Sequence, residues 1–352
     1  MKAAVCRTFG QPLSFENLTL GRPQGKALRI KVGATAICHS DITYIDGGWG
    51  GTPPILFGHE ASGVVLECGE DVTAFSPGDR VVITLMRSCG ACASCERELE
   101  AVCATPPGIG EGLLQDENGK AVAAAMNSGT FAEEVLVHER QCIAIPDDMG
   151  FDVAALLGCG VITGVGSVMR VGKVQPGETI AVIGVGGVGV NAIQAAKIAG
   201  AGAITAVDTD ASKRDLALAV GATSFCDPRQ DTPPENCDAV FVAVGSSKVI
   251  ENAIDMARTG GRVVIMGMPR DDDPVTLNMS DFAGDAKTVI GSKMGAAMIR
   301  EDIPQLITWY QEGKIDLDRL ISHRYPFDEI NSALETARNP GSMRVVLQFE
   351  ES

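Results

Sequence analysis

Four cysteines in one short segment have the spacing of a metal site. Cys89, Cys92, Cys95 and Cys103 form the pattern C-x2-C-x2-C-x7-C. Four thiolates can surround one zinc ion in a closed tetrahedral site, which leaves no position for a substrate. An iron–sulfur cluster is the competing interpretation. The ferredoxin run, however, has only three residues before its fourth cysteine and a proline after it, whereas Cys103 precedes Ala104. The spacing therefore predicts a structural zinc ion.

Three further residues, far apart along the chain, have the side chains of a second zinc site. Cys38 lies in Ile-Cys-His-Ser-Asp, His59 in Gly-His-Glu and Cys159 in Gly-Cys-Gly. Each alone is a weak signal, because a single cysteine is usually a small buried residue and a single histidine is more often a core residue than a ligand. Together they supply two thiolates and one imidazole, the ligand set of a catalytic zinc whose fourth position stays open.

A glycine-rich segment has the residues to bind a dinucleotide. Residues 179–183 form a short apolar run typical of a strand, and Gly184, Gly186 and Gly189 follow in the order G-x-G-x-x-G before a helical pattern. Gly184 permits a tight turn, Gly186 lets the main chain approach a pyrophosphate, and Gly189 lets the helix pack close to the strand. Gly187 and Val188 complete the loop and are expected to contact the cofactor with it.

Asp208 ends the next predicted strand, 19 residues after Gly189. A carboxylate there can accept hydrogen bonds from the ribose hydroxyls of NAD and would repel the 2′-phosphate of NADP, so we expect NAD. Lys213 and Arg214 follow within about one helical turn and weaken this preference, and Lys213 is a further candidate cofactor contact. In the competing interpretation the glycines merely form a turn and Asp208 caps the following helix.

These candidate residues need two kinds of framework to position them. The first part of the chain has short apolar runs typical of strands, at 27–32, 63–67, 80–84, 135–138 and 142–145. From about residue 161, buried strands alternate with helices, which predicts a parallel doubly wound sheet; the runs are 179–183, 188–199, 203–207, 212–220, 239–244 and 262–267. A helical pattern at 303–310 and a strand at 344–349 are inferred to return to the first domain.

Length and composition exclude several classes of protein. The 352 residues suggest two or three domains, and 45% apolar residues supply ample core. A net charge of -16 argues against binding to nucleic acid or to an anionic membrane surface. The chain does not begin with a secretory signal pattern, and 11 cysteines without one indicate reduced thiols. We therefore expect a cytoplasmic protein.

Taken in order, the motifs resemble those of the zinc-dependent medium-chain alcohol dehydrogenases over essentially the whole chain. They are Cys-His-Ser-Asp, Gly-His-Glu, the segment with four cysteines (the four-cysteine lobe), Gly-Cys-Gly, the Gly-Val-Gly-Gly-Val-Gly loop and a late Ser-Met-Arg. The resemblance implies an α/β protein with a GroES-like, β-rich catalytic domain at 1–160 and 295–352 and a Rossmann NAD-binding domain at 161–294. It also implies two zinc ions per chain, one catalytic and one structural.

The resemblance implies roles for single residues. Cys38, His59 and Cys159 would bind the catalytic zinc, and Ser40 would pass the substrate proton onward. Glu60 and Asp41 would lie beside the ligands, where a carboxylate can orient the histidine or approach the metal. The implied cofactor contacts are His39 and Arg344 at the pyrophosphate and Met266, Ser292 and Met294 around the nicotinamide.

One position departs from the family pattern. Many relatives have a histidine five residues after the first cysteine, where it ends the proton relay, and this chain has Thr43 there. Threonine has a hydroxyl group but cannot act as a base near neutral pH. Proton release through water or another group is therefore an open alternative to Thr43.

These residues predict the reversible oxidation of an alcohol to an aldehyde or ketone, with hydride transfer to NAD. A thiol-dependent formaldehyde dehydrogenase on the same fold stays an alternative. A polyol dehydrogenase is disfavoured because such relatives often lack the third cysteine ligand and the lobe, and a non-catalytic dinucleotide-binding protein is disfavoured because all three ligands are present. Candidate linings of an apolar substrate pocket are Leu85, Met86 and residues 47–54 with Trp49.

The strand predicted at 262–267 would be the last strand of the Rossmann sheet. An unpaired strand exposes hydrogen-bonding groups, so this edge is expected to pair with a second copy of the chain. The resemblance implies a homodimer or a homotetramer, and the sequence does not choose between them.

Overall fold

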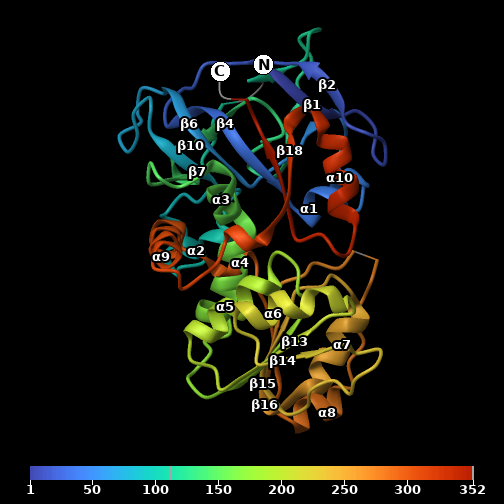
Figure 1. The fold of residues 1–352 in the computed structure, drawn as a ribbon. Helices are drawn as coiled ribbons and strands as arrows, with labels where there is room; N and C mark the ends of the chain where they lie inside the picture. Colours follow the sequence, from blue (N-terminus) through green and yellow to red (C-terminus); the bar gives the residue numbers. More distant parts are fainter. Residues whose placement is uncertain (111–112, 271, 351–352) are drawn as a thin grey trace. The chain divides into compact units, whose positions relative to one another are not determined.

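The computed structural model describes residues 1–110, 113–270 and 272–350 and divides the chain into two compact units (Figure 1). Unit 1 comprises Met1–Cys159, Met298–Ile307 and Leu317–Ser352, and unit 2 comprises Gly160–Ala297 and Thr308–Asp316. Unit 2 therefore includes residues 295–297 and 308–316, which the sequence analysis assigned to the C-terminal part of the catalytic domain. The chain passes from unit 1 to unit 2 after Ile307 and back to unit 1 after Asp316. No change in residue composition marks either point in the sequence.

A seven-stranded sheet forms the main framework of unit 1. Its strands lie in the order β11-β7-β6-β4-β19-β18, and β10 pairs with β4. Side chains of β4, β6, β7 and β10 share one buried apolar cluster, so the predicted β-rich domain is confirmed. The strands are β4 (Ala27–Ile37), β6 (Ala61–Cys68), β7 (Arg80–Ile83), β10 (Glu134–His138), β11 (Cys142–Ala144), β18 (Ile321–Pro326) and β19 (Arg344–Gln348).

The C-terminal strand β19 pairs with the strand that leads into the first metal motif. β19 runs antiparallel to β4 with Val345 opposite Ile37, and parallel to β18. Because Cys38 follows Ile37 and Arg344 precedes Val345, this register brings two predicted site residues together from opposite ends of the chain.

Unit 1 also contains helices and two smaller sheets. Helix α10 (Ile330–Arg338) buries Ile330, Ala333, Leu334 and Ala337, the i, i+3, i+4, i+7 positions of an amphipathic helix. A second sheet has the order β2-β1-β5-β9, and β3 pairs with β8. The remaining bounds are β1 (Lys2–Cys6), β2 (Ser14–Asn17), β3 (Thr19–Leu20), β5 (Ile55–Leu56), β8 (Leu114–Gln115), β9 (Ala123–Ala124), α1 (His39–Ile45), α2 (Ala93–Glu96) and α3 (Phe151–Leu156), with α9 (Ile299–Gln311) shared between the units.

Unit 2 contains a six-stranded sheet in which every pair is parallel. The order is β14-β13-β12-β15-β16-β17: the chain starts at the centre with β12, runs outward through β13 to β14, and then returns to place β15 on the other side of β12. This is the strand order of a Rossmann fold, so the predicted fold class is confirmed. The strands are β12 (Thr179–Ile183), β13 (Ala203–Val207), β14 (Ser224–Cys226), β15 (Cys237–Val242), β16 (Ala257–Ile265) and β17 (Thr288–Gly291).

Helices connect four of the five consecutive strand pairs of this sheet, as the alternating pattern predicts, and a loop at 227–236 connects β14 to β15. On α7, Ile250, Ala253 and Ile254 pack into the same buried cluster as Val240 and Val263 of the sheet. The helices of unit 2 are α4 (Ile162–Gly166), α5 (Gly189–Ile198), α6 (Arg214–Val220), α7 (Ser247–Met256) and α8 (Met279–Gly284).

The strand predicted at 262–267 is not the last strand of this sheet. It lies in β16, which pairs with β15 on one side and with β17 on the other. Both of its edges already make hydrogen bonds within the chain, so the prediction that this strand pairs with a second copy is wrong. The outer strand at this end of the sheet is β17, whose four residues are too few to give a clear strand pattern.

One helical stretch in the described part of the chain is long and apolar enough to cross a membrane by length and composition. It spans Phe151–Val171, and 89% of its most apolar window is buried inside the protein. Packing against the protein therefore accounts for its apolar character. Residues 179–196 also form a long stretch without charged side chains, and this stretch consists of β12, the glycine loop and most of α5.

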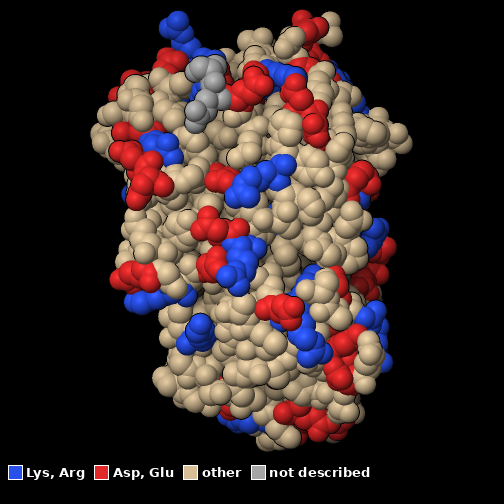
Figure 2. Space-filling model, in the orientation of Figure 1, with Lys and Arg blue, Asp and Glu red and all other residues tan. Residues whose placement is uncertain are grey.

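Charged side chains of both signs lie on the surface. On the face that Figure 2 shows, Lys and Arg side chains lie as small groups among Asp and Glu side chains. The chain contains many ion pairs with exposed or partly exposed side chains, such as Arg324 with Asp152 and Arg338 with Asp46. The basic groups are thus largely matched by acids, in keeping with a net charge of -16.

Candidate active site and metal sites

Cys38 lies at the junction between β4 and α1, where the chain changes from strand to helix. Its backbone is extended, with φ -98° and ψ 150°, and α1 begins at the next residue. The Cys38 backbone N–H donates to Asp41 Oδ2 at 3.1 Å, so an acid in the first turn holds the start of the helix. The Cys-His-Ser-Asp sequence thereby fixes the position of the Cys38 thiol.

The buried His59 ring is oriented by the same acid. His59 Nδ1 lies 3.0 Å from Asp41 Oδ1, which also accepts the backbone N–H of Gly58 at 3.2 Å. A carboxylate in this place keeps the proton on Nδ1 and leaves Nε2 as the nitrogen that can bind a metal. Ser40 Oγ lies 3.3 Å from Nε2, so a hydroxyl group stands beside that nitrogen.

Cys159 reaches these groups from a helical segment. It lies in the π-helical turn Leu157–Val161 that follows α3. The neighbouring Gly158 is required there, because a Cβ atom at this position would lie 2.5 Å from the Ile83 carbonyl oxygen. The ligand atoms of Cys38, His59, Glu60 and Cys159 all lie within 4.8 Å of one another. Residues separated by as many as 121 positions in the sequence thus meet in unit 1.

The electrostatics of this cluster suit a divalent cation. A hydrogen bond from Cys159, together with the His59 side chain, lowers the pKa of the Cys38 thiol well below its usual value. The same hydrogen bond and burial raise the pKa of Cys159. Burial disfavours the charged form of His59, but Asp41 and Cys38 outweigh it and raise its pKa. The cluster therefore shares protons that a bound metal ion would displace.

Glu60 lies beside these groups and pairs with Arg344. Both side chains are buried, and Arg344 Nη2 donates to Glu60 Oε2. Burial raises the pKa of Glu60 to about 8, although the Arg344 charge opposes the shift. Glu60 Oε1 has no hydrogen-bond partner among the described residues. Arg344 is thus engaged with Glu60, and its predicted contact with the cofactor pyrophosphate stays a prediction.

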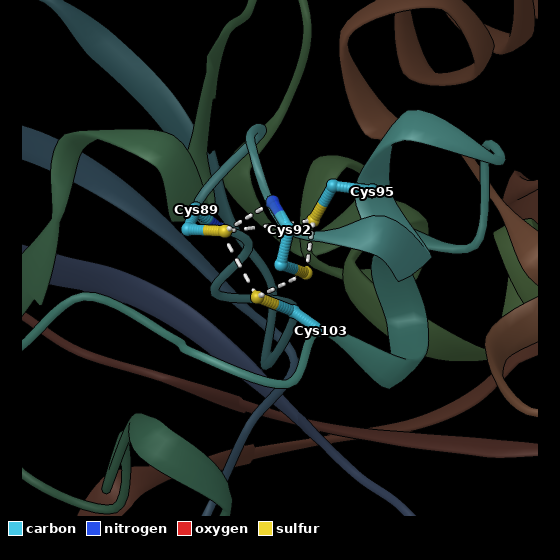
Figure 3. A group of neighbouring side chains, drawn as sticks. All are labelled: Cys89, Cys92, Cys95 and Cys103. Carbon is cyan, nitrogen blue, oxygen red and sulfur yellow. Dashed lines mark hydrogen bonds between the residues drawn. The ribbon is translucent and has the colours of Figure 1, made fainter.

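The four-cysteine lobe brings its sulfur atoms into one tight cluster (Figure 3). The Sγ atoms lie 3.5 Å apart for Cys92 and Cys95 and 3.9 Å apart both for Cys89 and Cys95 and for Cys92 and Cys103. A tetrahedral zinc ion with Zn–S bonds of about 2.3 Å requires sulfur atoms roughly 3.8 Å apart. The cluster therefore has the dimensions of a closed four-thiolate zinc site.

Backbone amides in the lobe stabilise negative charge on its sulfur atoms. Cys89 Sγ accepts the N–H groups of Ala91 and Cys92 at 3.4 and 3.2 Å, and Cys103 Sγ accepts that of Cys89 at 3.2 Å. A hydrogen bond from the Cys95 backbone lowers the pKa of Cys92 to about 5, whereas burial raises that of Cys95 to about 12. N–H groups aimed at sulfur favour thiolates, the form that binds zinc.

In unit 2, the glycine loop connects β12 to α5. Gly184 has φ +90°, which favours glycine, and a Cβ atom at Gly189 would lie 1.8 Å from the Gly184 carbonyl oxygen. A Cβ atom at Gly186 would meet nothing within 4 Å, so the main chain is open to a ligand there. Asp208 Oδ2 accepts the Val185 N–H at 2.7 Å and lies 3.3 Å from Lys213 Nζ.

A cavity of about 400 Å³ opens beside this loop, entirely within unit 2. Gly184 and Asp208 line it together with the apolar side chains of Val207, Val244 and Val249. Its other lining residues are Ile183, Thr209, Pro228, Pro233, Pro234, Glu235, Asn252, Asp255 and Met256. An apolar cavity next to a glycine loop and a strand-end acid has the features of a nucleoside site.

The three residues predicted around the nicotinamide are all largely buried in unit 2. Ser292 Oγ lies 2.7 Å from Ser167 Oγ, and the Thr163 hydroxyl lies 3.7 Å from the sulfur of Met294. Met266 donates its backbone N–H to Val242 at the end of β15. Ser292 and Met294 thus form one turn held by residues of the α4 region.

Comparison with known proteins identifies the family. Residues 24–147 match the model of the alcohol dehydrogenase GroES-like domain, and residues 187–312 match that of the zinc-binding dehydrogenases. S-(hydroxymethyl)glutathione dehydrogenase of Saccharomyces cerevisiae is 32% identical over 99% of this chain and 96% of its own length. The chain belongs to the zinc-dependent medium-chain alcohol dehydrogenases.

Two other members of the family are similar over nearly the whole chain. The NDMA-dependent alcohol dehydrogenase of Amycolatopsis methanolica is 34% identical over 98% of both chains. The crystal structure of benzyl alcohol dehydrogenase from Acinetobacter calcoaceticus superimposes with a TM-score of 0.92 over 99% of both chains, at 29% identity. The predicted family and reaction class of this dehydrogenase, a zinc-dependent oxidoreductase of the alcohol dehydrogenase type, are confirmed.

Two residues of α1 in this dehydrogenase bear on the proton relay. Thr43 donates its hydroxyl hydrogen to the His39 carbonyl oxygen at 3.0 Å, a bond to the preceding helical turn. The hydrogen of Thr43 is therefore engaged within the helix. The His39 side chain is exposed, and its predicted contact with the pyrophosphate stays a prediction.

The candidate pocket residues of the dehydrogenase differ in their packing. Met86 is buried, Leu85 is partly exposed, and Trp49 packs against Tyr44 with 6.0 Å between the ring centroids. The Trp49 indole nitrogen is buried without a hydrogen-bond partner among the described residues. Their role in lining a substrate pocket stays a prediction.

Sequence reasoning assigned no role to several buried polar residues of the dehydrogenase. Thr163 and Ser167 hold the turn at Ser292, and Asn191 and Gln194 lie in the helix after the glycine loop. The two amides are visible in the sequence as polar residues in an otherwise apolar run. The partners of Thr163 and Ser167 in this turn and one partner of Gln194, the backbone of Asp316, lie at least 122 residues away, so no local pattern identifies these contacts.

Proposed function

We propose that this chain reversibly oxidises alcohols to aldehydes or ketones and transfers the hydride to NAD. The observation that supports the proposal most directly is the cluster of Cys38, His59 and Cys159, whose ligand atoms lie within 4.8 Å of one another. Two thiolates and an imidazole are the donors of a catalytic zinc site with an open position, and the family supplies the reaction class.

These three side chains would hold the catalytic zinc ion, which when bound lowers the pKa of the alcohol oxygen that it polarises. Asp41 supports this role because it keeps the proton of His59 on Nδ1. Glu60 is held through one oxygen by Arg344, and its second oxygen is available as a transient ligand.

Ser40 would pass the proton of the alcohol onward, because its hydroxyl can take up that proton as it gives up its own. Its Oγ atom lies 3.3 Å from His59 Nε2, the nitrogen that would bind the metal. Thr43 is a poor next acceptor because it cannot act as a base near neutral pH and already donates to the His39 carbonyl. We therefore propose that the proton leaves Ser40 through water or another group.

The proposed cofactor is NAD. The glycine loop would bind the pyrophosphate, and the 400 Å³ cavity beside it would take the adenosine. The residues that line this cavity include three carboxylates, Asp208, Glu235 and Asp255, and no lysine or arginine. A 2′-phosphate would therefore meet negative charge there, which favours NAD over NADP.

We also propose that the four-cysteine lobe holds a second, structural zinc ion. A homodimer or homotetramer is proposed from the family, and β17, one of the two outer strands of the described sheet in unit 2, is the edge that a second copy would pair with. Reduced cysteines and the acidic composition support a cytoplasmic location.

The test is to count zinc in the purified protein and to measure NADH formation with a panel of substrates. The panel contains ethanol, a secondary alcohol, benzyl alcohol, and formaldehyde with and without glutathione. We expect two zinc ions per chain and alcohol-dependent formation of NADH. Formation of NADH only with formaldehyde and glutathione would favour the thiol-dependent alternative, and no turnover of any substrate would refute the proposal.

A further inference from the structure

Two buried amide side chains lie in α5, the helix that follows the glycine loop, and the proposed reaction makes no use of them. Asn191 and Gln194 lie on α5 with exposed fractions of 1% and 2%. Burying a polar amide costs free energy unless its hydrogen bonds are made. Two such groups in the first turns of the helix that follows the loop therefore call for a structural reason.

The first amide replaces a hydrogen bond that the helix backbone does not make. In a regular α-helix the Asn191 N–H would donate to the carbonyl four residues earlier, that of Gly187. Here the Asn191 N–H donates to the Val188 carbonyl instead, at 3.1 Å. The Gly187 carbonyl accepts the Asn191 side chain, with Nδ2 at 2.8 Å. A side chain thus holds the last peptide of the loop.

The second amide connects this bond to the C-terminal segment of unit 2. Gln194 Nε2 donates to Asn191 Oδ1 at 3.1 Å, and Gln194 Oε1 accepts the backbone N–H of Asp316 at 2.7 Å. Each amide uses both its donor and its acceptor, so neither can rotate without losing a bond. Asp316 is the last residue of the segment Thr308–Asp316, which belongs to the same unit.

We propose that Asn191 is a positioning residue for the pyrophosphate of the dinucleotide and that Gln194 fixes Asn191 to the segment Thr308–Asp316. The inference rests on the proposed binding of NAD. The Gly187 carbonyl and the Val188 N–H belong to one trans peptide and point in opposite directions. Holding the carbonyl against Asn191 therefore directs the Val188 N–H away from the helix, toward the position of an anion at its N-terminus.

The glycines explain why such a support is needed. Gly186 and Gly187 have no Cβ atom to restrict the peptides between them, so the loop can adopt several orientations at little cost. When a loop must become ordered on binding, the free energy of ordering is subtracted from the binding free energy, and the affinity falls. The buried amides would order it beforehand.

Three variants test the proposal through the dissociation constant of NADH, measured by fluorescence, and through kcat at saturating NAD. Asn191→Ala removes the bond to Gly187, and we expect NADH to bind about tenfold more weakly with kcat nearly unchanged. Asn191→Ser keeps a hydroxyl group that can donate to a carbonyl one turn earlier, and it should recover most of the affinity. Gln194→Met leaves the Asn191 donor in place but removes its anchor, so we expect a weakening of about threefold.

Asn331→Ala is the matched control. This amide in unit 1 also makes two bonds to the backbone, since its Oδ1 accepts the Leu13 N–H at 2.9 Å and its Nδ2 donates to the Leu13 carbonyl at 3.0 Å. Its loss should lower thermal stability and leave NADH affinity unchanged. A general effect of losing an amide that makes two hydrogen bonds would weaken NADH binding in this variant as well, and that result would overturn the proposal.

The other possible results also support or overturn the positioning role of Asn191. Equal weakening by Asn191→Ala and Asn191→Ser, or unchanged affinity in Asn191→Ala, overturns the positioning role while the proposed function stands. If Asn191→Ala does not fold, Gln194→Met provides the test, and unchanged affinity in that variant overturns the role. Failure of the unaltered protein to bind NADH would refute the proposed cofactor itself.

Discussion

Asp41 Oδ1 and His59 Nδ1 lie 3.0 Å apart, and both side chains are fully buried. The same carboxylate accepts the backbone N–H groups of Cys38 and Gly58. One acid on the first turn of α1 therefore orients two of the three proposed zinc ligands. Its position explains why Cys-His-Ser-Asp and Gly-His-Glu, which lie about 20 residues apart, act together in this fold.

Replacing Asp41 should weaken zinc binding at the catalytic site. In Asp41→Asn the side chain keeps its shape but loses the charge that fixes the His59 ring, and we expect zinc affinity at this site to fall about 10- to 100-fold. Competition with a chelator measures the loss. Asp46→Asn, which breaks a partly exposed ion pair with Arg338 at the end of the same helix, is the control. Equal zinc affinity in the two variants would mean that Asp41 does not position the ligand.

Substitutions should distinguish the role of Ser40 in proton transfer from that of Thr43, which lies one turn further along α1. Ser40→Ala removes the hydroxyl beside His59 Nε2, and we expect kcat to fall by about 100-fold or more while zinc content is unchanged. Thr43→Val should change kcat little, because the Thr43 hydroxyl donates to the His39 carbonyl. Steady-state kinetics on both variants decide the matter. A larger decrease in kcat for Thr43→Val than for Ser40→Ala would show that the roles of the two residues are reversed.

Cofactor choice should depend on the acid at the end of β13. Asp208→Ser removes the carboxylate proposed to bind the ribose hydroxyls, so kcat/KM for NAD should fall about 10- to 100-fold relative to that for NADP. Asp210→Ser, two residues further on, should leave the ratio near that of the unaltered protein. The ratio of kcat/KM values for the two cofactors gives the answer. No change in Asp208→Ser would show that preference is set elsewhere.

An ion pair at the start of β12 should make stability depend on pH. Arg262 Nη1 donates to Glu178 Oε1 at 2.9 Å, and this bond lowers the pKa of Glu178 below its ordinary value of 4.5. Because the pKa is lower in the folded state, the carboxylate stabilises the fold above the ordinary pKa, and this stabilisation is lost as pH falls through the folded-state pKa. Glu178→Gln should lower Tm by about 2–4 °C at neutral pH and by less in acid.

Thermal unfolding of the unaltered protein, Glu178→Gln and Glu335→Gln at several pH values checks this expectation. Glu335 is exposed and pairs only loosely with Arg338, at 3.5 Å, so its variant should match the unaltered protein. A Tm difference for Glu178→Gln that is constant from acid to neutral pH would show that its charge is not responsible.

The chemistry of this dehydrogenase was predictable where the residues that act together are close in sequence or have a distinctive type. The four cysteines lie within 15 positions, and their spacing alone indicates one metal ion. β12 and β13 coincide with the predicted runs at 179–183 and 203–207, because buried parallel strands are uniformly apolar. Gly184, Gly189 and Asp208 follow from the same local pattern.

Long-range contacts explain what the sequence did not reveal. Arg344 meets Glu60 only through the pairing of β19 with β4, and the two residues are 284 positions apart. Gln194 accepts a hydrogen bond from the backbone N–H of Asp316. Every residue except proline has such a group, so the sequence gives no sign of this contact. The short strand β17 was missed for a different reason, since four residues with partly buried side chains lack a clear period.

The most direct test of the catalytic site is zinc content and turnover measured together in Cys159→Ser. We expect this variant to contain one zinc ion fewer per chain than the unaltered protein, to bind NADH with similar affinity, and to form no NADH from alcohols. Full alcohol oxidation by a variant that lacks that zinc ion would contradict the role of Cys38, His59 and Cys159 as the ligands of a catalytic metal.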